Sequence, residues 1–460
     1  ERLRACDSYE VYHHLIRAGR LEVARKLGRN AYRRDLIAEF DALFPPQLFR
    51  GLPSHGNREW TPRMVVWVSL IMFWVSGNTL EEQFSAARRI VKFLRPDWRV
   101  PVSYSGFAVA QQHWWPLVGS LLMARLRPDE SAGKAWRVLG WLVLAVDGSR
   151  FECPRTTANE AGLGCAGRNK TAPQLFHTLL QHVGTGLPWD FRIGPGTDSE
   201  RRHLEDMLAD LPEQTLLTAD AGFTGYDLCS QLIDANQRFV LRIGGNKTLL
   251  ENLEDDESDE DIVYLWPQKQ QSQSQPALKL RRICFRSAGN LPVVLITNML
   301  DPNVLSDEDA QAIYQSRWGI EVYFRHLKQT MGFTTLKSRT PMTAMNEHHW
   351  RLISFWTLQH IAVRHQLAAG QAPHRFSAAR ARNEIRDVLQ LMQQGRRGPP
   401  LAQRWLTMQT DTYQRHGPKT TREWPRKKND KPPSPPKCRT ATTREIKRAK
   451  ELGFKFLLIS

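Results

Sequence analysis

The segment LSDEDAQAIYQSRWGIEVYFRHLKQTMG, residues 305–332, carries the signals of a single helix of about six turns. Ser306 suits an N-cap, acidic residues fill the first turn, and Gly332 suits a helix stop. At about 100° per residue, four polar side chains fall within an arc of about 60° on one face: Tyr314, Arg317, Glu321 and Lys328. One carboxylate therefore shares a helix face with two cations and a phenol, although ordinary ion pairs on a solvated face would give the same pattern.

Two further carboxylates each follow a run of apolar residues. Asp147 follows the run 138–146 and Asp220 follows the run 215–218, which we interpret as a central strand and a short buried strand. Taken singly, an Asp after such a run is commonly a turn residue that ends the strand. Together with Glu321, the two strand ends and the helix would deliver three acids to one edge of a sheet.

Three converging carboxylates can serve phosphoryl transfer. Magnesium prefers hard oxygen ligands and is commonly held by a few carboxylates together with substrate phosphates. Two such ions can activate the nucleophile on one side of a phosphodiester and stabilise the leaving oxygen on the other. We expect Asp147 to bridge both ions, Asp220 to hold one and Glu321 to hold the other.

The charge of the chain favours a polyanionic partner. The 460 residues carry a formal net charge of +17, and 41% of them are apolar, which is enough for two or three domains with cores of their own. Residues 418–450 hold twelve Lys and Arg against three acids. The segment 417–437 is rich in Pro and Lys and lacks core-forming residues, so we expect it to be a flexible basic arm. Nucleic acid is the simplest polyanion to fit. A basic RNA-binding protein is an alternative, but the sequence lacks an RNA-binding signature.

Other compositional features are typical of a cytoplasmic protein. Six scattered cysteines form no C-x-x-C pair, which favours reduced thiols and argues against structural zinc. The longest apolar run, 64–75, is too short to span a bilayer, and no signal peptide opens the sequence. The sequence begins with Glu1 rather than Met, so we expect a trimmed or incomplete N-terminus.

The order of helical and strand-like patterns predicts an α/β protein in six regions. These are 1–135, a helical and DNA-binding region; 136–243, the first part of the catalytic domain; 244–290, a β-rich insertion with an acidic, Gln/Ser-rich loop; 291–370, the second part of the catalytic domain; 371–417, a C-terminal helical region; and 418–460, the basic, Pro/Lys-rich tail. Helices joined by tight turns in the first region suit a helix-turn-helix-like reader of DNA, and an all-helical packing domain fits them equally well.

The residues singled out so far resemble a known family. The spacing from Tyr314 to Lys328, Tyr-x2-Arg-x3-Glu-x6-Lys, together with the two upstream aspartates, resembles the signature of the DDE transposases of bacterial insertion sequences, in particular the insertion sequence four family. The segments GRNK (167–170), DAGF (220–223) and LKSRTP (336–341) are also similar to that family. The resemblance covers about half of the chain, and the N-terminal helices match none of the family's DNA-reading motifs.

The resemblance implies an RNase H-like catalytic domain interrupted by a β-rich insertion. It further implies two Mg²⁺ ions, which Mn²⁺ can replace, held by the catalytic acids Asp147, Asp220 and Glu321. The implied partners are the terminal inverted repeats of a transposon and a target DNA, bridged by a homodimer in the bacterial cytoplasm and nucleoid. The implied reaction is cut-and-paste transposition, with hydrolysis at the transposon ends, a hairpin intermediate and strand transfer.

The resemblance also assigns DNA contacts. Three residues of the signature would contact phosphates near the scissile bond, and two cations in the connector after the helix would add to them: Tyr314, Arg317 and Lys328, then Lys337 and Arg339. Trp266 in the insertion would hold a flipped base by stacking, with core packing as the alternative. Two other functions stay open, a non-transposing nuclease of the same fold and an inactive or domesticated DNA-binding protein of transposase origin.

Overall fold

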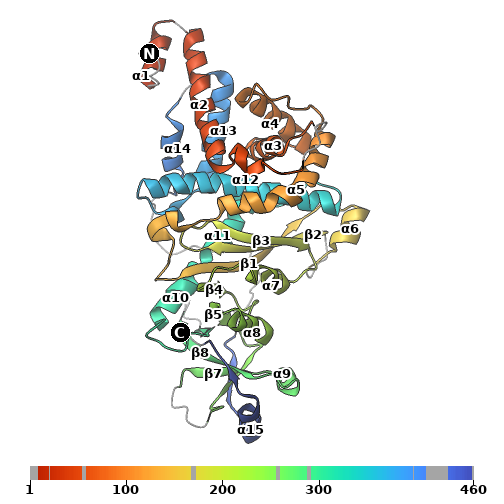
Figure 1. The fold of residues 1–460 in the computed structure, drawn as a ribbon, viewed down its shortest axis with the longest axis vertical. Coiled ribbons are helices and arrows are strands. Elements are labelled where there is room, and N and C mark those ends of the chain that lie inside the picture. Colours follow the sequence, from red (N-terminus) through yellow and green to blue (C-terminus); the bar gives the residue numbers. More distant parts are fainter. Residues whose placement is uncertain are drawn as a thin grey trace, which may run out of the picture.

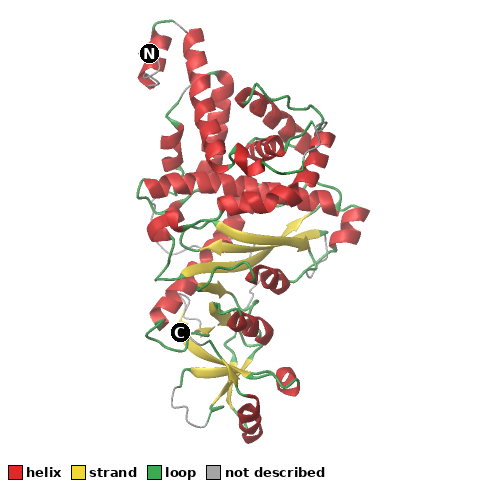
Figure 2. Cartoon of the chain, viewed as in Figure 1, coloured by secondary structure: helices red, strands yellow, loops and turns green. Residues whose placement is uncertain are grey.

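The computed structural model describes residues 9–19, 21–53, 59–166, 172–254, 260–286, 292–396, 398–410 and 434–457. Its centre is one mixed sheet of eleven strands, and most of the long helices form a layer on one side of it (Figures 1 and 2). The α/β class expected from the sequence is therefore confirmed. The GRNK segment, 167–170, lies outside the described residues.

The strands are β1 (Leu142–Glu152), β2 (Gln174–His182), β3 (Pro188–Pro195), β4 (Thr215–Ala219), β5 (Arg238–Ile243), β6 (Thr248–Glu251), β7 (Ile262–Leu265), β8 (Ala277–Arg286), β9 (Pro292–Thr297), β10 (Lys437–Thr440) and β11 (Phe454–Lys455). Along the sheet they follow the order β10-β6-β7-β8-β9-β5-β4-β1-β2-β3, and β11 pairs with β8.

The helices are α1 (Tyr9–Arg17), α2 (Leu21–Leu43), α3 (Pro62–Trp74), α4 (Leu80–Leu94), α5 (Tyr104–Leu126), α6 (Thr157–Leu163), α7 (Glu200–Leu208), α8 (Tyr226–Asp234), α9 (Gln268–Ser272), α10 (Asp307–Ser316), α11 (Trp318–Arg325), α12 (Pro341–Ala368), α13 (Ala378–Gln394), α14 (Leu401–Thr407) and α15 (Thr443–Leu452). Short helical turns lie at Pro46–Phe49, Glu130–Ala135, His326–Thr330 and Pro373–Arg375. Within the described ranges, no helix is long and apolar enough to cross a membrane.

Five neighbouring strands, β3-β2-β1-β4-β5, form the part of the sheet that carries the two aspartates. β1 is antiparallel to β2 and parallel to β4, while β2 is antiparallel to β3 and β4 is parallel to β5. Successive residues of a strand point to opposite faces of its sheet. Ala145 and Phe151 of β1 accordingly join the core formed with α11 and α12, whereas Leu144 and Val146 join the core formed with α7 and α8. Both faces of these strands are therefore covered by helices.

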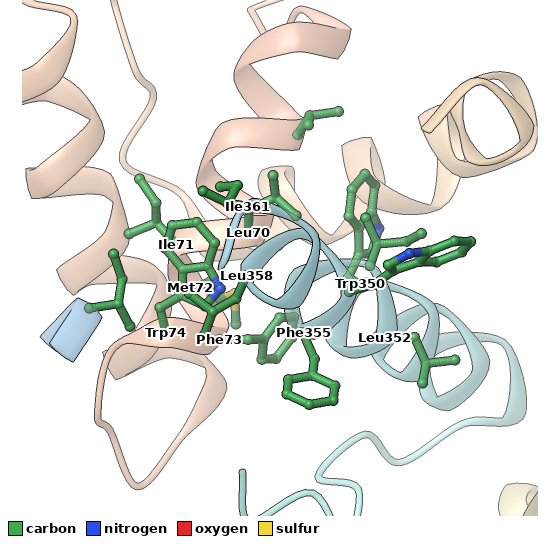
Figure 3. Close-up of a cluster of buried hydrophobic side chains, with 14 of the residues drawn as sticks. Leu70, Ile71, Met72, Phe73, Trp74, Trp350, Leu352, Phe355, Leu358 and Ile361 are labelled. Carbon is green, nitrogen blue, oxygen red and sulfur yellow. The ribbon is translucent and has the colours of Figure 1, made fainter. Parts of the chain in front are cut away.

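The helical layer is built around α12. Helices α3, α5, α13 and α14 contact it, and α3 buries nearly all of its side chains because it is apolar on every side. Figure 3 shows Phe73 and Trp74 of α3 beside Phe355 and Leu358 of α12. The N-terminal helices thus share one core with α12 and α13. The domain boundaries expected from the sequence stay predictions.

The insertion extends the main sheet instead of forming a separate hairpin. β6 to β8 continue from β9, and the Gln/Ser-rich stretch inside the insertion includes α9. The flexible arm predicted at 417–437 falls almost entirely on residues that the structure does not describe. After it, residues 437–455 form β10, α15 and β11. β10 adds to the edge of β6, and Ala449 of α15 is buried in the core under the insertion. Residues 418–433 lie outside the described residues.

The segment 305–332 is not the single helix that its sequence predicts. Ser306 caps α10 as expected, by accepting a hydrogen bond from the N–H of Asp309. The α-helical hydrogen bonding tightens at Arg317, whose N–H donates to the carbonyl of Tyr314, and α11 begins at the next residue. A π-helical turn, His326–Thr330, follows α11, and Gly332 ends the segment at a φ of 77°. The regular α-helical hydrogen bonding is therefore interrupted at two places, at Arg317 and at the π-helical turn.

Candidate active site

Asp147 lies inside β1 and not at its end, which corrects the expectation from the sequence. β1 continues to Glu152 because every residue from Leu144 onward is paired with β2. Its pairing with β4 stops at Ala145, since β4 itself ends at Ala219. From Asp147 on, β1 therefore has a strand neighbour on the β2 side and an open edge where β4 has ended. Asp220, as predicted, is the first residue after β4.

The strand register places the two aspartates at the same level. Ala145 of β1 is the partner of Thr218 of β4, and each aspartate lies two residues further along its own strand direction. Because the two strands are parallel neighbours, Asp147 and Asp220 occupy adjacent positions where β4 ends. This relationship could not be deduced from the apolar runs alone, because it depends on how two distant segments pair.

Glu321 lies near enough to Asp147 to affect its pKa. Burial raises the pKa of Asp147 to about 7, and the charges of Asp220 and Glu321 raise it as well. Two groups lower the pKa of Asp147: the N–H of Gly148, which donates to Oδ1 at 2.8 Å, and the Arg317 guanidinium. The three predicted acids are thus close enough to influence one ionisation, which scattered carboxylates would not do.

Arg317 connects the helix to the acids. Its guanidinium donates to Oε1 of Glu321 at 2.9 Å and stacks over the ring of Tyr314 at 5.6 Å from the ring centroid. Tyr314 is itself buried and packs edge-on against Phe285. The structure therefore brings Arg317 and Glu321 together at the site, whereas Tyr314 lies behind Arg317 and supports it.

Lys328 lies on the π-helical turn at the edge of the same site. Its Nζ is 4.9 Å from the centroid of the Phe151 ring on β1. Burial lowers the pKa of Lys328, and the charges of Glu152 and Asp147 oppose that shift. The ammonium therefore borders the site from the side of β1, although the helix between it and Arg317 is not regular.

The remaining predicted DNA contacts have different surroundings. Lys337 donates from Nζ to the carbonyls of Gly77 at 3.3 Å and Asn78 at 2.7 Å, which ties the connector to the N-terminal helices. Arg339 is exposed. The Trp266 side chain is 2% exposed and donates from Nε1 to the carbonyl of Gln275, a position that favours the core-packing alternative; base stacking by Trp266 stays a prediction.

Two residues near the site were missed by the sequence reasoning. Trp318 is 58% exposed directly beside Arg317. The sequence places Trp318 opposite the apolar stripe of the helix, and this position was a signal of function. Core packing does not explain a large aromatic residue on a polar helix face. The second is Glu200, the first residue of α7, whose carboxylate approaches Asp220 from the other face of the sheet. Nothing in the local sequence points to it.

The donor set fits a hard divalent cation. Within the described ranges, no group of three or more His, Cys, Asp or Glu side chains is already arranged to hold a metal ion. The carboxylates of Asp147, Asp220 and Glu321 nevertheless offer only oxygen donors. Burial is the main cause of the raised pKa of Asp147, the charges of the other two acids add to it, and a divalent cation would offset that repulsion. Oε1 of Glu321 already accepts from Arg317, so a cation would bind the other oxygen of this carboxylate or share Oε1 with the guanidinium.

Residues 141–356 match the sequence model of the family described as "Transposase DDE domain". This match supports a DDE transposase. The matched segment contains Asp147, Asp220 and Glu321. A curated relative, "Probable transposase for insertion sequence element IS5377" from Geobacillus stearothermophilus, is 25% identical over 151 residues, which are 32% of this chain. The match spans 39% of that relative's length.

A solved structure, that of a piggyBac transposase synaptic complex with hairpin DNA, is 12% identical in sequence. The similarity covers 84% of this chain and 88% of the piggyBac chain, with a TM-score of 0.41. That TM-score is too low to carry an argument about the fold.

Proposed function

We propose that this protein is a DDE transposase of the insertion sequence four type, which cleaves DNA at transposon ends and joins those ends to target DNA. The observation that carries the proposal is the meeting of Asp147, Asp220 and Glu321: a shared strand register for the first two and a common electrostatic influence on Asp147 for all three. These acids lie within the segment that matches the transposase DDE domain.

The strand order supports an RNase H-like catalytic domain. Three antiparallel strands followed by two parallel ones, in the order β3-β2-β1-β4-β5, agree with the RNase H-like domain that the resemblance implies. The β-rich insertion between β5 and β9 and the Glu-bearing helix after β9 agree with the same proposal. The hairpin intermediate, the terminal inverted repeats and the homodimer are further parts of the proposal that rest on the resemblance.

Asp147, Asp220 and Glu321 would hold the divalent metal, Mg²⁺ or Mn²⁺. When bound, such ions activate the attacking oxygen and stabilise the leaving oxygen of a phosphodiester. The residues of the chain then have separate tasks. Arg317 orients Glu321 and, with Lys328, adds positive charge where a phosphate would lie. Asp147 has to lose its proton before it can serve as a ligand, and nearby positive charge favours that loss.

The test compares cleavage with binding on DNA that carries the ends of the element. Asp147→Asn should abolish Mg²⁺-dependent cleavage and strand transfer while DNA binding persists. Glu308→Gln, an exposed acid on α10, is the control and should leave both unchanged. Cleavage by the Asp147→Asn protein would reject the proposal. Cleavage without joining in the unaltered protein would favour the nuclease, and binding without cleavage would favour the inactive DNA-binding protein.

A further inference from the structure

Glu200 lies against the backbone next to both aspartates of the site. It is the first residue of α7, and α7 covers the face of the sheet opposite to α11. A Cβ atom added at Gly148 would lie 3.0 Å from Oε2 of Glu200, and one added at Gly222 would lie 3.0 Å from Oε1. Gly148 follows Asp147 directly, and Gly222 follows Asp220 by two residues. The Glu200 carboxylate therefore lies close to two glycines that neighbour the two acids, and at Gly148 it shares that space with the ring of Phe176.

The backbone does not explain these glycines. Neither Gly148 nor Gly222 has a φ in the left-handed region, so an L residue could adopt either conformation. At Gly148 an added Cβ would also meet the ring of Phe176, at 2.7 Å. At Gly222 the nearest atoms are carboxylate oxygens: Oδ1 of Asp220 at 2.9 Å and Oε1 of Glu200 at 3.0 Å. A side chain at position 222 would therefore displace one or both of these carboxylates.

Among the described residues, no Lys or Arg side chain pairs with both the Asp220 and the Glu200 carboxylate. Both oxygens lie within 3.0 Å of the same point, and Asp220 Oδ1 accepts one hydrogen bond, from the N–H of Gly222. In the part of the chain that the structure describes, the Glu200 carboxylate has no hydrogen-bond or ion-pair partner. Burial raises the pKa of Glu200, and the charge of Asp220 raises it further.

The nearby arginines are committed to backbone carbonyls. Arg201 donates to the carbonyls of Gly222 and Thr224, and Arg150 donates to that of Gly196 and stacks on Phe176. They lower the pKa of Glu200 from a distance but do not pair with it. Asp220 and Glu200 are both half-buried, and the Glu200 carboxylate has no partner within the described ranges. Two such carboxylates cost free energy unless they share a cation or a proton.

We propose that Glu200 is a fourth acid of the active site, which binds the divalent cation together with Asp220 from the α7 face of the sheet. This inference rests on the proposed function, because it takes that cation to be the one that DNA cleavage uses. Asp220 can serve both sides because it stands at the open end of β4, where the sheet no longer separates the two faces.

The experiment measures cation binding to the full chain without DNA, so that activity is not the readout. Calorimetric titration with Mn²⁺ is compared for the unaltered protein, Glu200→Gln and Glu205→Gln, an exposed acid on the same helix. Glu200→Gln should lower the affinity for Mn²⁺ by about tenfold or more, in the range that the loss of a supporting or direct carboxylate produces. Glu205→Gln should leave it unchanged.

Two more variants keep the outcome decisive. Glu200→Asp, which keeps the charge on a shorter side chain, should weaken Mn²⁺ binding less than Glu200→Gln, and Gly222→Ala should weaken it by displacing the carboxylate. Unaltered Mn²⁺ affinity in both Glu200 variants, with Asp220→Asn impaired in binding and in DNA cleavage, would overturn this inference and leave the proposed function standing. If Asp220→Asn also bound Mn²⁺ and cleaved DNA normally, the proposed function itself would fail.

Discussion

Asp147 and Asp220 stand side by side at the end of β4, each two residues beyond the paired residues Ala145 and Thr218 of two parallel strands. The pair is asymmetric. Asp147 is held within a strand that continues along β2, with its pKa raised to about 7 mainly by burial, whereas Asp220 belongs to the loop that begins there. A rigid acid and a more adjustable one at the same level can accept a cation whose other ligands come from substrate and water.

Cation binding should depend on pH through Asp147. Because its pKa is raised to about 7, the carboxyl binds a proton below that pH, and a cation has to displace the proton. The affinity for Mn²⁺ should fall by about tenfold for each pH unit below 7 and level off above it. Titrations between pH 5.5 and 8 measure this. An affinity for Mn²⁺ that does not change with pH would mean that Asp147 stays ionised over this range, and it would contradict a cation ligand with a raised pKa.

The raised pKa of Asp147 also predicts that the free energy of unfolding falls as pH rises, whereas the affinity for the cation increases. A carboxyl whose folded pKa is raised favours the folded state when protonated, so its contribution is complete below its unfolded pKa of about 3.9 and is lost as pH rises through about 7. Without divalent cation, Asp147→Asn should therefore gain free energy of unfolding relative to the unaltered protein at pH 8 and little at pH 4. Urea unfolding at both pH values measures the difference. An equal effect at both would contradict the shift.

Glu321→Gln should remove cation-dependent cleavage and leave the fold intact. The ion pair with Arg317 is partly exposed on the Glu321 side, at 34%, and pairs of that kind contribute about 1 kcal/mol or less. Thermal unfolding should change little, and Glu308→Gln serves as the control for both measurements. A protein that melts well below the control would show that Glu321 is structural.

The buried pair of Glu347 and Arg351 should be necessary for the connector that follows the catalytic helix. Both side chains are 3% exposed, and Glu347 also accepts from the N–H groups of Lys337 and Ser338. Glu347→Gln leaves the Arg351 charge buried without its partner, which should cost about 3–5 kcal/mol of unfolding free energy. The exposed pair of Arg155 and Glu160 is the control, and Glu160→Gln should leave the free energy of unfolding unchanged. Similar costs for the two variants would refute the assignment.

Exposure should separate the roles of two tryptophans. Trp318→Ala should leave stability unchanged and weaken binding to DNA with unpaired bases at its end by about 1–3 kcal/mol, because base stacking needs a free aromatic face. Trp266→Ala should instead destabilise the protein by about 3–5 kcal/mol by opening a cavity. Fluorescence anisotropy and urea unfolding measure the two quantities. A stability loss at Trp318, or none at Trp266, would reverse the roles.

Local sequence signals predicted those features that depend on a few neighbouring residues. The cap at Ser306, the stop at Gly332 and the strand before Asp220 are examples, because the residues within one or two turns of each decide them. The same reasoning ended β1 too early at Asp147. A polar residue interrupts an apolar run but does not interrupt a strand whose neighbour continues.

By itself the sequence determined the α/β class, the three acids with their spacing, and the basic character of the chain. Only the tertiary structure decided that Asp147 and Asp220 lie at the same level of the sheet and that Glu200 approaches them from the opposite face. It also decided that Lys337 binds the N-terminal helices and that residues 437–455 join the sheet. The physical reason is that strand register and packing across a sheet join segments far apart in the chain, and no local propensity encodes which distant partner a strand will take.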